Sequence, residues 1–190
     1  RLTWQNGRRE YFDYTGRLIG IQDRYENTIT LIHANRSKYP HITITDTLGR
    51  QTVISGQDTE NGHCMLVALP DGNTLRYQVE HDGSAWALAS YTDAGGRITQ
   101  YSYTRQRAGF DALSKSTSSS EYAYLNLTTV THPTMAQSVY TYAPVERNLG
   151  ADGLMVVYRI ASRADRIGSD TVNQRTYSYS ENDCSGYPQH

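Results

Sequence analysis

The chain lacks an excess of charge of either sign. Its 190 residues include 18 Lys and Arg against 19 Asp and Glu, which gives a formal net charge of −1. A protein that holds nucleic acid or an anionic membrane by bulk electrostatics needs a positive field. We therefore expect no nucleic-acid partner.

Cysteine is also scarce, and Cys64 and Cys184 lie far apart in the sequence. Structural zinc sites usually show closely spaced ligand pairs, and a disulfide framework needs more cysteines. Two separate buried thiols are the favoured interpretation. One long-range disulfide in an exported protein is the alternative. Neither interpretation includes a metal site.

Long apolar runs and nucleotide-binding motifs are missing as well. No stretch of about 18 apolar residues occurs, so we expect no membrane span. No phosphate loop, dinucleotide fingerprint or Gly-x-Ser-x-Gly elbow is present, so we expect no cofactor. The first residues, Arg1 to Trp4, resemble the middle of a strand and not a signal peptide. We expect a segment of a larger exported protein whose export signal lies upstream.

Tyrosine is abundant, with 16 copies against 2 Phe and 2 Trp. Tyr, Thr, Ile and Val recur with a period of two, which places alternate side chains on the two faces of a sheet. This alternation is present at residues 42–45, 75–79, 98–103, 125–128, 139–142 and 175–179. Turn signals separate the runs, and no stretch has convincing helical spacing. The sequence predicts an all-β fold of consecutive antiparallel hairpins.

Two stretches interrupt the alternation. Residues 105–121 include a serine-rich polar run, and residues 143–153 contain Pro144 and two glycines. Both are expected to form surface loops. Strand patterns resume directly on either side, so residues 1–190 are expected to form a single segment and not two domains.

The strongest pattern is a repeated phrase, Asp-x-x-Gly-Arg. Its glycines are separated by irregular intervals of 33 and 47 residues. A weaker variant begins at Asp23 and ends at Asn27, and Asp71 with Gly72 is interpreted as a contracted variant. The three full copies supply Asp13, Gly16, Arg17, Asp46, Gly49, Arg50, Asp93, Gly96 and Arg97.

Each position of the phrase has a physical role in a hairpin. The Asp accepts hydrogen bonds from backbone amides two residues further on. The Gly adopts the positive φ that a tight turn requires. The Arg begins the return strand, where its stem covers apolar surface and its head reaches an acid. Repeated hairpins of this kind are expected to stack edge to edge.

These residues resemble a known family. Residues 11–24, which begin Tyr11-Phe12-Asp13, closely resemble the YD repeat of RHS-repeat proteins, and residues 91–103 look like another copy. The resemblance extends from residue 1 to about 142, with Glu26 where the family often has Gly. It implies a β-ribbon that winds spirally into a hollow shell in a large secreted or cell-surface protein.

In bacterial relatives such a shell encloses a toxic polypeptide, and teneurins use a similar shell in adhesion. The resemblance therefore implies two partners, the neighbouring repeats and an enclosed polypeptide. The family's shells often end in a self-cleaving motif that contains Asp-Pro, and this chain has no Asp-Pro pair. We expect a non-enzymatic structural module. Open sheet edges in a short segment also predict self-association.

Catalytic alternatives are weaker. His63 and Cys64 are the most tempting pair, since a thiolate beside an imidazole can act as a nucleophile. Adjacent strand residues point to opposite faces, which keeps the two side chains apart. Paired carboxylates could hydrolyse a glycoside, but turn roles already explain the aspartates.

The tyrosines allow two interpretations. Tyr-x-Tyr spacing places both rings on one face, where they can form cross-strand ladders or a platform that stacks on sugar rings. The spacing recurs with the strands, which favours ladders. The alternative function is a module that binds a cell-surface glycan through Tyr101, Tyr103, Tyr140 and Tyr142.

Overall fold

The computed structural model describes residues 1–34, 38–83, 85–107, 109–110, 123–148 and 154–179. All regular structure in these ranges is β-strand, which confirms the predicted all-β class. The chain divides into two compact units. Unit 1 comprises Arg1–Asp82 and Trp86–Ile98, and unit 2 comprises Gly83–Ala85 and Thr99–His190. The prediction that residues 1–190 form a single repeat segment stays a prediction.

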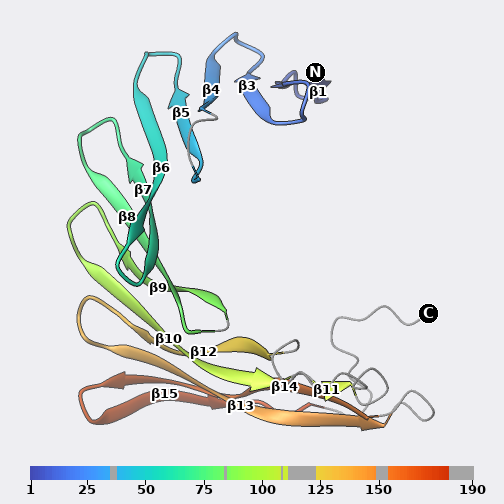
Figure 1. The fold of residues 1–190 in the computed structure, drawn as a ribbon, viewed down its shortest axis with the longest axis vertical. Helices are drawn as coiled ribbons and strands as arrows, with labels where there is room; N and C mark the ends of the chain where they lie inside the picture. Colours follow the sequence, from blue (N-terminus) through green and yellow to red (C-terminus); the bar gives the residue numbers. More distant parts are fainter. Residues whose placement is uncertain (35–37, 84, 108, 111–122, 149–153, 180–190) are drawn as a thin grey trace. The chain divides into compact units, whose positions relative to one another are not determined.

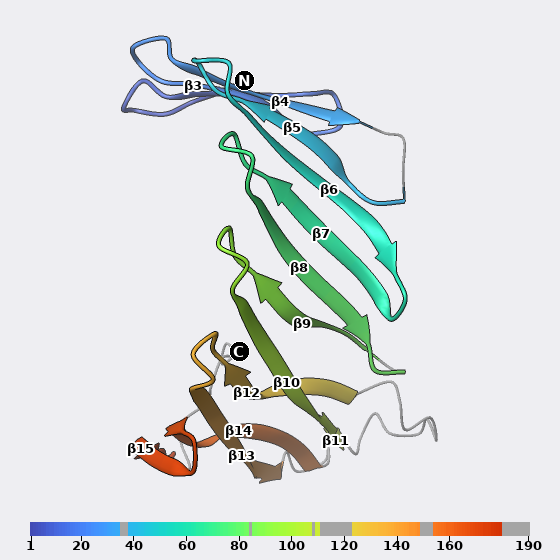
Figure 2. The ribbon, with the colours of Figure 1, turned by 90° about the vertical axis from the view of Figure 1, so that its left-hand side faces the viewer.

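Unit 1 is a meander in which every strand pairs antiparallel with the next (Figures 1 and 2). Its hairpins follow one another without a crossover, as the alternating pattern predicts. The strands are β1 (Leu2–Thr3), β2 (Arg9–Phe12), β3 (Leu18–Gln22), β4 (Thr28–Ala34), β5 (His41–Thr45), β6 (Gln51–Thr59), β7 (Gly62–Ala68), β8 (Thr74–His81) and β9 (Trp86–Thr92).

In unit 2 the sheet follows the order β10, β12, β13 and β14. The short β11 and the last strand, β15, both pair with β14, so β11 departs from consecutive pairing. The strands are β10 (Ile98–Arg107), β11 (Gly109–Phe110), β12 (Ala123–Thr131), β13 (Gln137–Asn148), β14 (Leu154–Ile167) and β15 (Asp170–Thr176).

Strands extend into both of the stretches predicted as loops. Strand β10 continues to Arg107, and β13 continues through Pro144 to Asn148. Pro144 lies opposite Tyr158 of β14. The register of β13 with its other neighbour, β12, covers only residues 137–139, so Pro144 lies outside that ladder. A proline is tolerated in a strand where its nitrogen faces away from a ladder, so it does not end β13. Residues 111–121 and 149–153 lie outside the described residues.

The strands of unit 1 form one sheet with alternate side chains on its two faces. On β7, His63, Met65 and Val67 alternate with Cys64 and Leu66, so the two sets point to opposite faces. Among the residues whose exposure is described, only Cys64, Ser138 and Arg159 are buried. Backbone pairing and cross-strand contacts therefore carry more of this fold than a central core does.

Candidate functional site

Seven hairpin turns in the described residues share one backbone geometry. In each, the amide of the first residue donates to the carbonyl of the fifth, and the amide of the fourth donates to the carbonyl of the first. The fourth residue has a positive φ, which is the three-residue hairpin loop with a bulge. The turns are Trp4–Arg8, Asp13–Arg17, Asp23–Asn27, Asp46–Arg50, Leu69–Asn73, Asp93–Arg97 and His132–Ala136.

Four of these turns begin with an aspartate whose side chain accepts the backbone amides of the third and fifth residues of the same turn. Asp46 Oδ1 accepts the amides of Leu48 and Arg50 at 2.9 and 3.0 Å, and its Oδ2 accepts Arg50 Nε at 2.6 Å. Asp13 and Asp93 make the same contacts with their arginines. In the turn that begins at Asp23, the side chain of Asn27 replaces the guanidinium.

These contacts keep the turn carboxylates ionised. The pKa of Asp93 is lowered, first by the backbone amide of Arg97 and then by its side chain, against partial desolvation. The pKa of Asp13 is lowered by the Thr15 hydroxyl above all, together with the amide and guanidinium of Arg17. Each carboxylate is therefore a fixed internal acceptor of its own turn, which suits a structural role better than an acid–base role.

The turn at Asp71 corrects the sequence-based interpretation. It is not contracted, because it spans Leu69 to Asn73 and has the same five-residue geometry as the others. Its aspartate occupies the third position, where Oδ1 accepts the Asn73 amide at 3.0 Å and Oδ2 accepts Asn73 Nδ2 at 2.9 Å. Pro70 at the second position fixes the φ that this turn needs, so an aspartate at the first position is not required.

Sequence reasoning missed the turns Trp4–Arg8 and His132–Ala136. The first has an Asn-Gly pair, and Asn6 Oδ1 accepts the Arg8 amide at 3.0 Å. The second has a proline at its second position and Met135 at its fourth, with φ 66°. A search for proline at the second position would have found it, because Leu69-Pro70 begins an equivalent turn.

Four of the turns form a row, which we call the turn row. Its members begin at Asp23, Asp46, Leu69 and Asp93, at intervals of 23, 23 and 24 residues. Successive hairpins alternate between the two ends of the strands, so every second turn lies at the same end (Figure 2). From Asp23 to Asp93 the two-strand period is therefore 23 or 24 residues. The turn Trp4–Arg8 also lies at this end, 19 residues before Asp23, whereas the turn at Asp13 lies at the opposite strand ends.

The turns of the row that begin at Asp23 and Asp46 are also linked by a side chain. Thr47, in the turn that begins at Asp46, accepts the backbone amide of Thr28 at 2.7 Å and donates to its carbonyl at 2.9 Å. Thr28 directly follows the turn that ends at Asn27. The Thr47 hydroxyl thus bonds both backbone polar groups of Thr28 in the adjacent hairpin.

Four tyrosines of unit 2 are half-buried. Tyr101, Tyr103, Tyr140 and Tyr142 all lie in strands, and the Tyr142 hydroxyl donates to the carbonyl of Leu127 at 2.8 Å. Desolvation raises the pKa of Tyr103 and of Tyr142, with a smaller contribution from the tyrosine two residues earlier. In unit 1, the rings of Tyr77 and Tyr91 are 4.9 Å apart and form a cross-strand pair, as the ladder interpretation predicts. Glycan stacking by Tyr101, Tyr103, Tyr140 and Tyr142 stays a prediction.

His63 and Cys64 do not assemble into a catalytic pair. They are neighbours on β7 and point to opposite faces. The His63 ring lies 5.3 Å from Tyr39 and 4.9 Å from Trp86, between centroids. Cys64 is a free thiol with no exposed surface. Cys184 lies outside the described residues.

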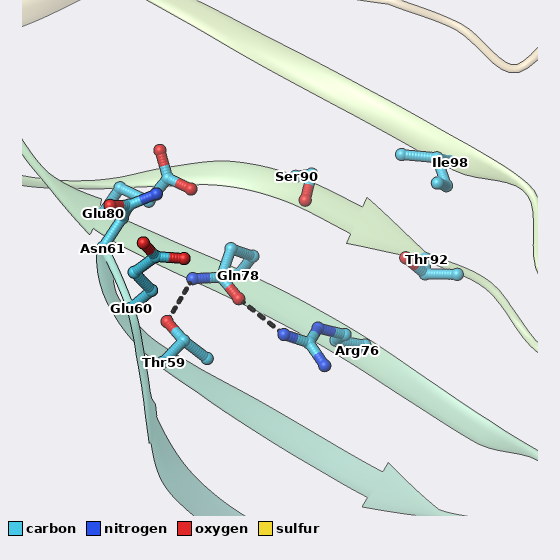
Figure 3. A pocket seen from close by; sticks show the side chains of 9 residues that line it. All are labelled: Thr59, Glu60, Asn61, Arg76, Gln78, Glu80, Ser90, Thr92 and Ile98. Carbon is cyan, nitrogen blue, oxygen red and sulfur yellow. Dashed lines mark hydrogen bonds between the residues drawn. The ribbon is translucent and has the colours of Figure 1, made fainter.

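A polar groove of about 480 Å³ lies on the face of unit 1 that carries Cys64. Gln78 on β8 spans it, donating to Thr59 Oγ1 at 2.7 Å and accepting from Arg76 at 2.9 Å (Figure 3). Sequence reasoning missed this groove. Its lining residues are Thr59, Glu60, Asn61, Arg76, Gln78, Glu80, Ser90, Thr92 and Ile98.

Comparisons with known proteins do not name a family. No protein-family model matches the chain, and no curated protein matches it. Across the described ranges, no helix has the length and apolarity needed to cross a membrane. Among the same residues, no three His, Cys, Asp or Glu side chains gather as metal ligands would. The resemblance to the YD repeat stays a prediction.

Proposed function

We propose that this chain is a non-enzymatic structural module that forms part of a β-sheet wall in a large exported protein. In this proposal the wall encloses an effector polypeptide and keeps it from solvent and proteases. The observation that supports it most is the turn row, with one turn every 23 or 24 residues. A two-strand repeat lets each hairpin cover the edge that its predecessor leaves open.

The bonding of the charged groups also supports a structural role. The carboxylates of the turns are occupied by their own amides and arginines, as Asp46 and Arg50 illustrate. The best nucleophile candidate, Cys64, is buried away from His63. Both features favour a passive scaffold over a hydrolase.

The test uses the parent protein. Gly49→Val and Gly72→Val should each disrupt one turn of the row, and limited proteolysis of the parent should then cut the enclosed polypeptide faster. Arg175→Gln, an exposed change on β15 away from the turns, is the control. The proposal fails if the turn variants destabilise the sheet while the enclosed polypeptide stays as resistant to proteolysis as before.

A second candidate function is recognition of a cell-surface glycan, favoured by an exposed aromatic group. Trp86 is 57% exposed, and its ring contacts His63 and His81 at 4.9 and 4.8 Å. An exposed indole offers a flat apolar surface with a polar edge, which can stack on a sugar ring. Glycan-array binding that is lost in Trp86→Ala but kept in Tyr142→Phe would support this function. Absence of glycan binding in the unmodified chain would exclude it.

A further inference from the structure

The polar groove has opposite charges at its two ends. Arg76, Gln78 and Glu80 alternate along β8 and therefore share one face. At about 3.3 Å per residue, the Cα atoms of Arg76 and Glu80 are roughly 13 Å apart. Glu60, in the turn after β6, lies at the same end as Glu80 (Figure 3). The groove thus has a cationic end, a neutral polar middle and an anionic end.

Among the described residues, the charges in the groove form no ion pairs, in contrast to those of the turns. Arg17, Arg50 and Arg97 each pair with the aspartate of their own turn. Within the part of the chain that the structure describes, no ion pair includes Arg76, Glu60 or Glu80. Arg76 donates to the neutral Gln78, which leaves further guanidinium donors for a ligand.

The floor of the groove is fixed by the small residues of β7. Gly62 and Cys64 lie between β6 and β8, so the Gln78–Thr59 hydrogen bond crosses above β7. A Cβ on Gly62 would lie 2.2 Å from the Val79 carbonyl oxygen, so no side chain can fill this position. The hydrogen bonds of Gln78 hold its amide group in the middle of the groove, where it can hydrogen-bond a polar ligand.

We propose that this groove binds a short extended peptide with a free ammonium group and a free carboxylate. The ammonium group contacts Glu60 and Glu80, and the carboxylate takes the planar donors of Arg76. The hydroxyl of Ser90 and the amide of Gln78 bond the peptide groups between them. A fully extended chain spans about 3.3–3.6 Å per residue, so about four residues match the spacing of the Arg76 and Glu80 Cα atoms. This function goes beyond the proposed wall and does not depend on it.

The test is titration of the 190-residue chain with tetra-alanine that carries both free termini. Binding is followed by amide chemical shifts, and we expect shifts confined to β6–β9 with a dissociation constant of about 1 mM or tighter. N-acetyl tetra-alanine lacks the cation and tetra-alanine amide lacks the anion, and each should bind at least tenfold more weakly. Dialanine is too short to reach both ends and should also bind weakly.

Variants locate the site. Arg76→Gln and Glu80→Gln should each weaken tetra-alanine binding about tenfold, and Arg175→Gln should leave it unchanged. Spectra of the free variants must retain the dispersion of a folded sheet, which separates loss of the site from unfolding. Equal binding of the blocked and free peptides would overturn the proposal. So would shifts outside β6–β9, or binding of neutral saccharides in place of peptides. None of these results bears on the wall.

Discussion

Asp71 occupies the third position of its turn and Asp46 the first position of the preceding turn in the row, yet both carboxylates accept the amide of the fifth residue at 3.0 Å. The shared element is therefore the bonding of that amide and not the identity of one position. This explains how turns with dissimilar sequences, such as the one with Pro70, keep the same backbone.

Gly96 tests the conformational part of the turn. Its φ is +75°, and no atom lies within 4 Å of where a Cβ would be. Replacing Gly96 with Val should therefore destabilise the chain by about 1–3 kcal/mol through backbone strain alone. Urea unfolding measures the change. Gly96→Asn, which tolerates positive φ, should lose much less. Equal stability of the two variants would show that strain does not set the cost.

Glu26 offers the reverse experiment, because a non-glycine residue already occupies the strained position with φ 71°. Glu26→Gly should stabilise the chain by about 0.5–1 kcal/mol, the relief of strain minus the greater entropy that glycine loses on folding. The shift in the urea midpoint measures it. Arg24→Gly, two residues earlier in the same turn, should not stabilise. A lower midpoint for Glu26→Gly would mean that the Glu26 side chain contributes more than its backbone costs.

The alternation of side chains was enough to predict the all-β hairpin fold, because period two is a local property of each strand. The period of the turn row was not evident, because the turn at Asp13 lies at the other strand ends and breaks the spacing of the Asp-x-x-Gly-Arg phrases. Which turns lie side by side depends on the number of strands between them. The hairpin from Thr59 to Gly62 lacks the Asp-x-x-Gly-Arg sequence. A search for that sequence therefore misses this hairpin and gives the wrong number of strands between successive copies.

The groove could not be predicted for a related reason. It depends on Gln78 reaching Thr59 across the strand that contains Gly62, and these residues are brought together by the registers of two ladders. A sequence pattern shows which residues share a face of one strand. It does not show which residues lie opposite each other two strands away.

The turn aspartates predict loss of stability in acid. The folded-state pKa values of Asp46 and Asp93 lie below the unfolded value of about 3.9. Their stabilising contribution is therefore complete above that pH and is lost as the pH falls through the folded pKa. The urea midpoint should decrease from pH 5 to pH 3. Asp93→Asn should flatten this decrease, whereas Asp170→Asn, outside these turns, should not. An identical pH profile for Asp93→Asn would contradict the assignment.

Gly62 and Gly20 both lie in strands but are expected to respond differently to an added methyl group, because a Cβ on Gly62 would clash and its φ of +159° disfavours a side chain. A Cβ on Gly62 would meet the Val79 carbonyl oxygen at 2.2 Å, whereas a Cβ on Gly20 would meet its nearest neighbour, in the Tyr11 ring, at 3.6 Å. Gly62→Ala must push β7 and β8 apart and should destabilise the chain by about 1–3 kcal/mol. Gly20→Ala should be neutral or stabilise by about 0.5–1 kcal/mol, because alanine loses less entropy in a strand. Urea unfolding of both variants decides the matter: equal costs would show that the Gly62 position can open without disturbing the ladder between β7 and β8.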